Sequence, residues 1–356
     1  MLRRSFLAAP ALLAQSDGFS AKPMRVHLRD TWTTVMSSSD YRDTIFFVLR
    51  QGGIEAFGEG APIVRYKESA ATGCAAIEGL GDGFFRENSP EAFEKALDKV
   101  FERIPGEWAA KAAVAAAVLD WKGKKQGVPV WKMLGLDAKA APVTTFSIGI
   151  DTPEVTRRKV REAAAYPVLK IKVGLDSDEA TIAAVRAETK KPLRVDANEG
   201  WKSKEQAVEK INWLEKQGVE LVEQPLPAPM VEEMNWVRKR VHIPVLADES
   251  CLYPADVAKV APYFDGINVK LDKCGGILEA YRMVQMARKL KLKTMLGCMI
   301  SSSLAITAAA HLSPLVDYAD LDGNLLLRDD PFEGVKVAEG KLVLPVGLGL
   351  GVRRRG

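Results

Sequence analysis

The sequence has few of the residues that bind soft metals or form covalent cross-links. Among its 356 residues are 4 cysteines and 3 histidines. The cysteines show neither a CxxC pair nor zinc-finger spacing, so we interpret them as free thiols. The sequence also lacks an apolar run long enough to span a bilayer. These absences argue against a zinc finger, and they predict no membrane span.

An excess of one charge is also missing. The formal net charge is +4, from 50 basic and 46 acidic residues spread along the chain. Such a small, dispersed excess argues against nucleic acid as a partner. The dense basic run at residues 353–355 is interpreted as a solvated tail. With 47% hydrophobic and 27% charged residues, the composition is that of a soluble globular protein with one large and one smaller domain.

The first 22 residues have a composition of their own. Arg3 and Arg4 precede a short apolar run with small residues at 8–14. This order is typical of an export signal, and the arginine pair is similar to the twin-arginine type. The alternative is a frayed cytoplasmic extension. We predict export to the periplasm and leave residues 1–22 out of the fold argument.

Two patterns of secondary structure follow this leader. The first region, residues 23–140, mixes strands and helices. We expect a strand at 26–35, a polar loop at 36–41, a hairpin of 44–50 and 54–58, and helices at 90–104 and 108–125. From residue 143 onward, short apolar segments alternate with helical ones. The expected strands are 143–150, 168–173, 193–196, 220–223, 245–248, 267–270, 294–296 and 316–319. Eight strands alternating with helices predict a (β/α)₈-type barrel, in which the final helix is missing.

Two lysines interrupt the apolar segment at 168–173. Lys170 and Lys172 lie two positions apart, so both side chains share one face of a strand. Taken alone, the pair indicates an edge strand with a solvated lysine face. In a barrel strand the lysines are buried instead, and a buried ammonium group needs a partner. A second cation nearby lowers the pKa of a lysine and makes it a usable general base.

Carboxylates stand at the ends of the next three strands. Asp196, Glu223 and Asp248 each end a strand, and barrel active sites lie at the C-terminal ends of the strands. Each carboxylate alone is compatible with a helix N-cap. Three at one mouth would repel one another unless a cation joined them. An oxygen-only ligand set favours Mg²⁺, with Mn²⁺ as an alternative.

A second lysine position faces this acidic set from the other side. Lys172 and Lys270 lie on the second and sixth of eight strands, and therefore on roughly opposite sides of a closed barrel. A divalent ion can bind a substrate carboxylate and stabilise the enediolate that forms when the adjacent carbon loses its proton. Two lysines on opposite faces would then invert that carbon by a 1,1-proton transfer. Lys170 is the third catalytic candidate, expected to depress the pKa of Lys172.

This set of residues resembles the active site of the enolase superfamily, in its muconate lactonizing enzyme subgroup. The similarity covers nearly all of the chain after the leader and includes the Gly-Glu-Gly-Ala-Pro run at 58–62. The resemblance implies an α/β fold, a (β/α)7β modified TIM barrel at 141–340 under an N-terminal α+β capping domain at 23–140. It implies that residues 341–356 return to the capping domain or form a tail. By position, Asp196, Glu223 and Asp248 would be the metal ligands, and Lys172 and Lys270 the acid/base pair.

Within the subgroup the sequence is most similar to the dipeptide epimerases, L-Ala-D/L-Glu epimerase among them. The matching runs are 65–69, 195–198, 223–227, 247–251, 297–299 and 320–322. The resemblance implies substrate contacts by Arg65, Tyr66, Cys298, Met299, Asp320 and Asp322. The Asp-x-Asp run would bind the α-ammonium of a free dipeptide, for which an acidic pair is the expected partner. On its own, that pair is more typical of a loop turn or a cap.

The capping loop departs from the pattern of this family. An arginine there often meets the side chain of a C-terminal glutamate. Residues 34–40 contain no basic residue, and the next one is Arg42. This departure puts recognition of a C-terminal glutamate in doubt and points to a smaller or apolar residue.

The three histidines lie away from the predicted strand ends. They are His27, His242 and His311. The sequence therefore does not resemble the mandelate racemase branch, which uses a His-Asp pair. His311 lies in an alanine-rich helical run and is predicted to be packed.

The main hypothesis is an Mg²⁺-dependent epimerase of cell-wall-derived dipeptides, and two alternatives stay beside it. In the first, the same site performs cycloisomerisation, N-acylamino acid racemisation or o-succinylbenzoate synthesis, whose substrates lack a free ammonium. In the second, the barrel binds a metal or a peptide without catalysis. The partner is a small molecule under the main hypothesis, and a homo-oligomer is one of the assemblies open to the chain.

Overall fold

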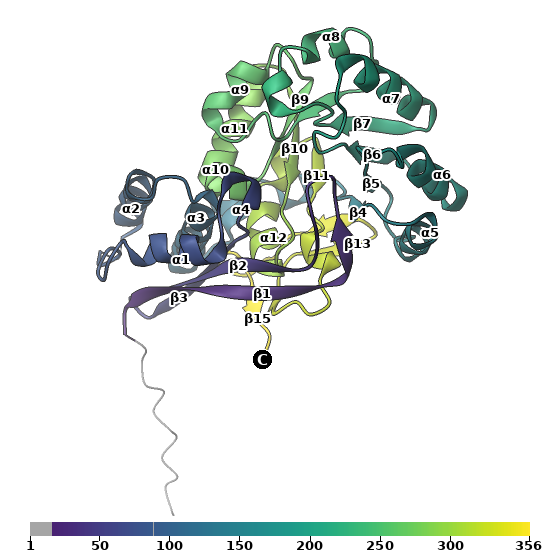
Figure 1. Cartoon of the computed structure of the whole chain (residues 1–356). Coiled ribbons are helices and arrows are strands. Elements are labelled where there is room, and N and C mark those ends of the chain that lie inside the picture. Colours follow the sequence, from purple (N-terminus) through teal and green to yellow (C-terminus); the bar gives the residue numbers. More distant parts are fainter. Residues whose placement is uncertain (1–15, 88) are drawn as a thin grey trace, which may run out of the picture.

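The N-terminal unit is an antiparallel sheet covered by helices. The computed structural model describes residues 16–87 and 89–356. The sheet has the strand order β1-β2-β3, and the helices α1–α3 lie beside it (Figure 1). The elements of the N-terminal unit are β1 (Gly18–Thr33), β2 (Ser38–Gln51), β3 (Ile54–Gly60), η1 (Val64–Tyr66), α1 (Ala70–Glu78), α2 (Pro90–Arg103), α3 (Trp108–Gln126), α4 (Val130–Met133) and η2 (Ala138–Ala140).

The first strand begins earlier than predicted. Residues 18–22, which we assigned to the end of the leader, form the start of β1 and pair with the end of β2. Phe19 packs against Phe47 and Phe85, with ring centroids 5.8 and 5.6 Å apart, so this segment contributes to the core. The polar loop predicted at 36–41 is also shorter, because β2 already begins at Ser38. The rest of the leader, residues 1–15, lies outside the described residues.

The second unit is a parallel barrel of eight strands, and this confirms the predicted fold class. The strands follow one another around the sheet in the order of the sequence. They are β4 (Phe146–Ile148), β5 (Leu169–Lys172), β6 (Leu193–Asp196), β7 (Val219–Glu223), β8 (Val245–Ala247), β9 (Gly266–Val269), β10 (Lys293–Gly297) and β11 (Tyr318–Asp320). All four residues of β5, β6 and β9 are buried, as expected for strands covered on both faces.

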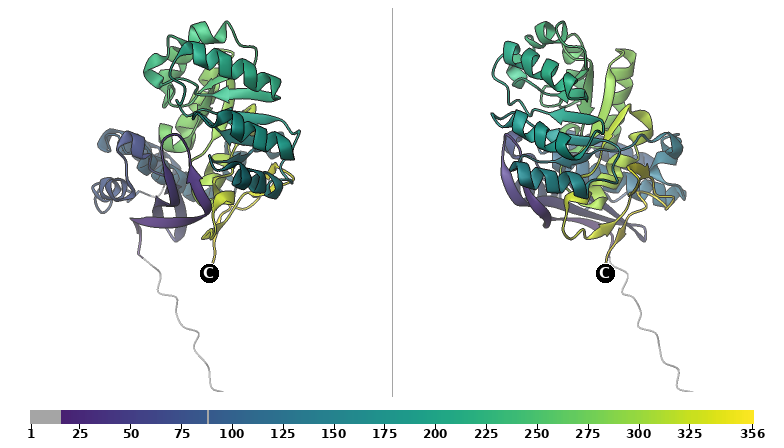
Figure 2. Two further views of the ribbon diagram at one scale, coloured as in Figure 1. Left: turned by 45° about the vertical axis from the view of Figure 1, so that its right-hand side comes forward. Right: turned by 90° about the vertical axis from the view of Figure 1, so that its right-hand side faces the viewer.

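Helices surround the barrel on its outer side (Figures 1 and 2). They are α5 (Pro153–Glu162), α6 (Asp178–Glu188), α7 (Lys204–Lys216), α8 (Met234–Arg238), α9 (Pro254–Val260), α10 (Leu271–Cys274), α11 (Ile277–Lys289) and α12 (Ser303–Ala310). The one-turn helix α10 precedes α11 in the same connection, so seven connections carry helices. Among the described residues, none of the helices combines the length and the apolar character that a membrane crossing requires.

No α-helix follows the last barrel strand in the described chain. Instead, β11 leads into η5 (Gly323–Leu326) and the short strands β12 (Phe332–Glu333), β13 (Lys336–Ala338), β14 (Lys341–Val343) and β15 (Arg353–Arg354). This C-terminal segment lies beside the N-terminal sheet in both views of Figure 2. Phe332 packs on Phe46 at 5.5 Å, and Leu350 donates its N–H to Asp120 at 2.8 Å. The end of the chain therefore ties the barrel to the N-terminal unit.

The run Gly58-Glu59-Gly60 joins the two units for steric and polar reasons. A Cβ at Gly58 or Gly60 would lie within 2 Å of the carbonyl oxygens of Ala113 and Ala109, so only glycine lets β3 approach α3 this closely. The buried carboxylate of Glu59 accepts hydrogen bonds from the N–H groups of Ser302 (3.1 Å) and Ala305 (3.2 Å). It thereby caps the N-terminus of α12 from the other unit.

Candidate active site

Parallel strand register brings the predicted metal ligands together. Lys172 on β5 is level with Asp196 on β6, which is level with Glu223 on β7. Asp248 follows the end of β8 directly. One carboxylate oxygen from each of Asp196, Glu223 and Asp248 lies within 4.8 Å of the others, and all three residues are buried. The structure therefore groups the three carboxylates that we predicted from the strand ends.

Lysines compensate Asp196 and Asp248, whereas the pKa values of Glu223 and Glu249 show that these two carboxyl groups favour a further cation. Burial and the negative charge of Asp196 raise the pKa of Glu223 to about 8. Burial and Asp248 likewise raise the pKa of the neighbouring Glu249 to about 7. Three buried oxygens around the group have no hydrogen-bond partner among the residues that the structure describes, namely Asn198 Oδ1, Asn268 Oδ1 and Glu249 Oε2. An oxygen-only donor set with unsatisfied oxygens beside it fits Mg²⁺, which keeps several water ligands when bound to protein.

Two lysines flank the carboxylates from either side along the sheet. Lys172 Nζ lies 2.6 Å from Asp196 Oδ2, and Lys270 Nζ lies 2.6 Å from Asp248 Oδ2. Lys172 ends β5 and Lys270 directly follows β9, and these two strands enclose the three strands that lead to the carboxylates. Although burial lowers it, the pKa of Lys270 is held above its usual value by Asp248 and Glu223. A cation among the carboxylates would take over part of this pairing.

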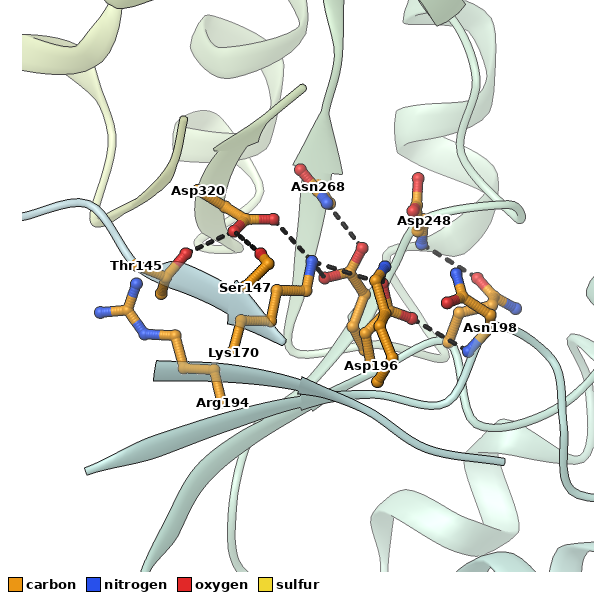
Figure 3. Close-up of polar contacts among 12 residues, drawn as sticks. Thr145, Ser147, Lys170, Arg194, Asp196, Asn198, Asp248, Asn268 and Asp320 are labelled. Atoms are coloured by element: carbon orange, nitrogen blue, oxygen red, sulfur yellow. Dashed lines mark hydrogen bonds and ion pairs between the residues drawn. The ribbon is translucent and has the colours of Figure 1, made fainter. Parts of the chain in front are cut away.

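Lys170 lies buried among carboxylates of the metal group and of the acidic pair. Its ammonium contacts Asp320 Oδ2 (2.6 Å), Glu223 Oε2 (2.7 Å) and Asp196 Oδ2 (3.3 Å). In Figure 3 its side chain points between Asp320 and Asp196. Burial opposes the charge, but Asp320 and Glu223 hold the pKa of Lys170 well above its usual value. Because three carboxylates surround its ammonium, Lys170 is an internal counter-ion, and its predicted electrostatic role beside Lys172 stays a prediction.

The acidic pair after β11 lies next to this network. Asp320 accepts hydrogen bonds from the hydroxyl groups of Thr145 and Ser147 and from Lys170 (Figure 3). Burial favours its neutral form, but Lys170 lowers the pKa of Asp320 to about 2. The Asp322 carboxylate accepts the backbone N–H of Ser147, and burial and the charge of Asp320 raise its pKa to about 7. An ammonium group brought to Asp322 would favour its charged form.

The capping-domain candidates lie near the same mouth. The Arg65 guanidinium forms a two-pronged ion pair with Glu199, a barrel residue between β6 and α7, and one of its bonds measures 2.8 Å. Burial, followed by the charges of Asp248 and Glu249, raises the pKa of Tyr66 above its usual value. Arg65 therefore joins the two units, and its contact with substrate stays a prediction.

Cys298 and Met299 directly follow β10, and both are partly exposed. Burial of the thiol and the charges of Asp322 and Asp320 raise the pKa of Cys298. The thiol is therefore a neutral part of the wall beside the acidic pair. Cys298 is one of four free cysteines in the described chain, as predicted.

Two residues in the site were not predicted to act there. Asn268 donates its amide N–H to Glu223 Oε1 at 2.6 Å, and Lys273 donates to Asp248. Both lie within three residues of Lys270. Because side chains alternate along a strand, Asn268 and Lys270, which are two positions apart, point to the same side. That alternation could have identified Asn268. His311, in contrast, is packed as predicted: it accepts the N–H of Trp131 at 3.1 Å, and burial lowers its pKa to about 4.

Comparison with known proteins agrees with this geometry. Residues 154–355 match the family model of the enolase C-terminal domain-like proteins. The L-Ala-D/L-Glu epimerase of Bacteroides thetaiotaomicron is 39% identical over 333 residues, which are 93% of this chain and 86% of that protein. This chain belongs to the dipeptide epimerases of the enolase superfamily. The L-Ala-D/L-amino acid epimerase of Pedosphaera parvula is 42% identical over 94% of this chain and 98% of its own length.

A solved structure extends the similarity to the fold. The dipeptide epimerase of Enterococcus faecalis, complexed with Mg and the dipeptide L-Leu-L-Tyr, superposes with a TM-score of 0.86 at 32% identity. The match covers 94% of this chain and 99% of that one. The resemblance stated from the sequence motifs is thereby confirmed, with the family's barrel and its capping domain.

Proposed function

We propose that this chain is an Mg²⁺-dependent dipeptide epimerase that inverts the α-carbon of the C-terminal residue of its substrate. One observation carries the proposal: Lys172 and Lys270 are bonded to different members of one carboxylate group, Asp196 and Asp248, and they lie at the ends of the two strands that enclose it. A planar intermediate held between the two lysines has one on each face. Proton removal on one face and return on the other give inversion.

The carboxylates and the lysines of the site have different roles in the proposed reaction. Asp196, Glu223 and Asp248 would hold Mg²⁺, and the bound ion would supply positive charge at the substrate carboxylate. One lysine must be neutral to accept the α-proton while the other is charged to donate one. Which lysine is the base depends on the epimer that is bound, since each faces one side of the carbon.

The acidic pair supplies recognition of the other end of the substrate. Asp320 is already bonded to Lys170, whereas the Asp322 carboxylate accepts the N–H of Ser147 and has no ion pair with any described residue. A free dipeptide carries an ammonium at the end opposite its carboxylate, and a charge-assisted hydrogen bond to Asp322 suits it. Substrates with an acylated amino group lack this contact.

For the C-terminal residue we propose a small or apolar side chain. The turn between β1 and β2 contains no basic residue, and Met36 at this turn is 51% exposed. A glutamate side chain would find no arginine at this turn. The bound L-Leu-L-Tyr in the Enterococcus faecalis structure supports the view that this fold accepts apolar dipeptides.

A dipeptide library tests the reaction and its specificity together. Purified protein with Mg²⁺ is incubated with L-Ala-L-Xaa dipeptides, and chiral chromatography measures the change at each residue. We expect epimerisation at the C-terminal residue, faster for small and apolar residues than for glutamate. Absence of epimerisation with every dipeptide would contradict the proposal. Preference for glutamate would contradict the specificity alone.

We also propose that the enzyme is exported and acts on dipeptides released from the cell wall. The support is the twin-arginine-like pattern of Arg3 and Arg4 ahead of a short apolar run. The test is fractionation of cells that express the full chain or its Arg3→Lys/Arg4→Lys variant. We expect the unaltered chain in the periplasm and the variant in the cytoplasm. The unaltered chain in the cytoplasm would contradict export.

A further inference from the structure

Each carboxylate of the candidate metal group is held in the same two-sided way. One oxygen faces a lysine, Lys172 for Asp196, Lys170 for Glu223 and Lys270 for Asp248. The other oxygen is held by a second donor: the backbone N–H of Asn198 for Asp196 (2.9 Å) and the amide of Asn268 for Glu223 (2.6 Å). For Asp248 the second donor is the ammonium of Lys273. Of these three second donors, the Lys273 ammonium is charged, whereas the N–H of Asn198 and the amide of Asn268 are neutral.

Lys273 reaches this position because the chain turns sharply after β9. The single turn of α10 begins after Lys270, and the N–H of Lys273 donates to the carbonyl of Lys270 at 3.1 Å. Gly275 ends the turn with φ +91°, a conformation that glycine adopts without strain. This geometry points the two lysines at opposite oxygens of one carboxylate.

The Lys273 ammonium is buried, and its hydrogen bonds are all made to oxygens of Asp248 and of nearby main-chain carbonyl groups. Besides Asp248 Oδ1, its ammonium donates to the carbonyl oxygens of Asp248 (2.8 Å), Asn268 (2.9 Å) and Cys251 (3.1 Å). Four oxygens therefore share its three N–H donors. The side chain is 1% exposed, so substrate cannot reach it. The carbonyl contacts also join the end of β8 to β9, which fixes the backbone under Asp248.

We propose that Lys273 is a positioning residue for the metal site: it holds Asp248 Oδ1 so that Oδ2 is presented to the ion. The inference rests on the proposed Mg²⁺ site. Removing the ammonium has two opposite consequences. The carboxylate loses its anchor, which weakens metal binding, and the site loses a positive charge, which strengthens binding of a cation. Under the positioning role the first effect is the larger one.

Isothermal titration of Mg²⁺ into the metal-free protein separates these effects without measuring turnover. We expect Lys273→Met to raise the Kd for Mg²⁺ by about 10- to 100-fold, as removal of a residue that orients a metal ligand does. Lys259→Met is the matched control, because Lys259 is 69% exposed and pairs with Asp256 on the surface. We expect its Kd to equal that of the unaltered protein.

The results of this titration test the positioning role of Lys273 and the metal site separately. A Kd for Lys273→Met that is unchanged or lower would overturn the positioning role, whereas failure of the unaltered protein to bind Mg²⁺ would overturn the metal site itself. If Lys273→Met does not fold, Lys273→Gln takes its place, since the amide keeps two N–H donors for the carbonyl groups but no charge. We expect a raised Kd there too, and an unaltered Kd in that variant would overturn the inference.

Discussion

The two ends of the candidate site differ in how their charges are matched. At the metal end, Asp196 pairs with Lys172, Asp248 pairs with Lys270 and Lys273, and Glu223 shares Lys170. At the ammonium end, Asp320 has the same Lys170, but the described ion pairs include none to Asp322. The first end is arranged before substrate arrives, and the second leaves one carboxylate for a cation from outside. A ligand with a carboxylate and an ammonium fits both ends.

Lys170 connects the two ends. Its ammonium lies between Glu223 and Asp320, so the same charge stabilises one metal ligand and one residue of the acidic pair. Removing a partner from a buried ion pair costs more than the pair contributes, because the remaining charge is left uncompensated. Substitutions at the metal end and at the ammonium end therefore test whether the two ends differ in how their charges are matched.

The largest effect is expected at the metal end. Removing Mg²⁺ with a chelator, or the Asp196→Asn substitution, should lower the epimerisation rate by about 10³-fold, because several kcal/mol of charge stabilisation are lost in the transition state. Chiral chromatography measures the rate. Adding Mg²⁺ back should restore the chelated protein but not the variant. A chelated protein that keeps its full rate would show that the carboxylate group does not need a metal.

At the ammonium end we expect a smaller and more selective loss. Asp322→Asn should lower kcat/KM for free dipeptides by about 10- to 100-fold, the equivalent of one charge-assisted hydrogen bond. The rate for an N-acetylated dipeptide, already low, should not change. Asp329→Asn is the matched control, because Asp329 is exposed and pairs with Arg328 on the surface. Equal losses for free and acetylated substrates would argue against ammonium recognition by Asp322.

The two carboxylates with raised pKa values near the metal end also predict how Mg²⁺ stabilises the fold at different pH. In the metal-free protein the pKa values of Glu223 and Glu249 are raised to about 8 and about 7 from 4.5, chiefly by burial. Because these folded-state pKa values lie above the unfolded value of 4.5, the metal-free protein loses stability as pH rises from about 4.5 to about 7–8, where the two groups become charged in the folded state. Mg²⁺ compensates the charges that appear, so it should raise Tm more at pH 8.5 than at pH 6, which differential scanning fluorimetry can measure. An equal Tm shift at both pH values would count against this.

The smallest effect concerns the neutral donors of the ammonium end. Thr145 donates its hydroxyl to Asp320, and Thr145→Val keeps the shape of the side chain without the donor. A hydrogen bond to a charged group contributes about 1.5–3 kcal/mol, but Lys170 still holds Asp320, so we expect KM for a free dipeptide to rise only about fivefold. Steady-state kinetics provide the measurement, with Mg²⁺ affinity as the control. A change in Mg²⁺ affinity as large as the change in KM would mean that the two ends are not separable.

The barrel and its carboxylate group could be predicted from the sequence because both follow from local rules. Strand residues alternate in side, and parallel strands end at one edge, so Asp196, Glu223 and Lys172 meet by register alone. The predicted limits of the first strand were wrong, because the pairing of residues 18–22 with β2 depends on a distant partner.

Contacts between segments far apart in the sequence could not be predicted for the same reason. Arg65 and Glu199 are 134 residues apart, and nothing near either of them indicates their ion pair. Lys170 was placed on the correct strand, but its contact with Asp320 depends on closure of the barrel between β5 and β11 across β4. Side-chain partners across a closed barrel are set by geometry that one strand's sequence does not contain.

The account depends most on the two lysines acting on opposite faces of one carbon, and exchange in deuterated water tests this directly. Each epimer of a dipeptide substrate is incubated separately with the unaltered protein, Lys172→Ala, Lys270→Ala and, as an exposed control, Lys259→Ala. Mass spectrometry and NMR then locate deuterium. We predict deuterium at the C-terminal α-carbon of both epimers with the unaltered and control proteins. Each active-site variant should lose epimerisation by about 10²–10⁴-fold, and each should retain exchange with a different epimer. Exchange of the same epimer by both variants, or epimerisation at the unaltered rate in either, would contradict the two-base assignment.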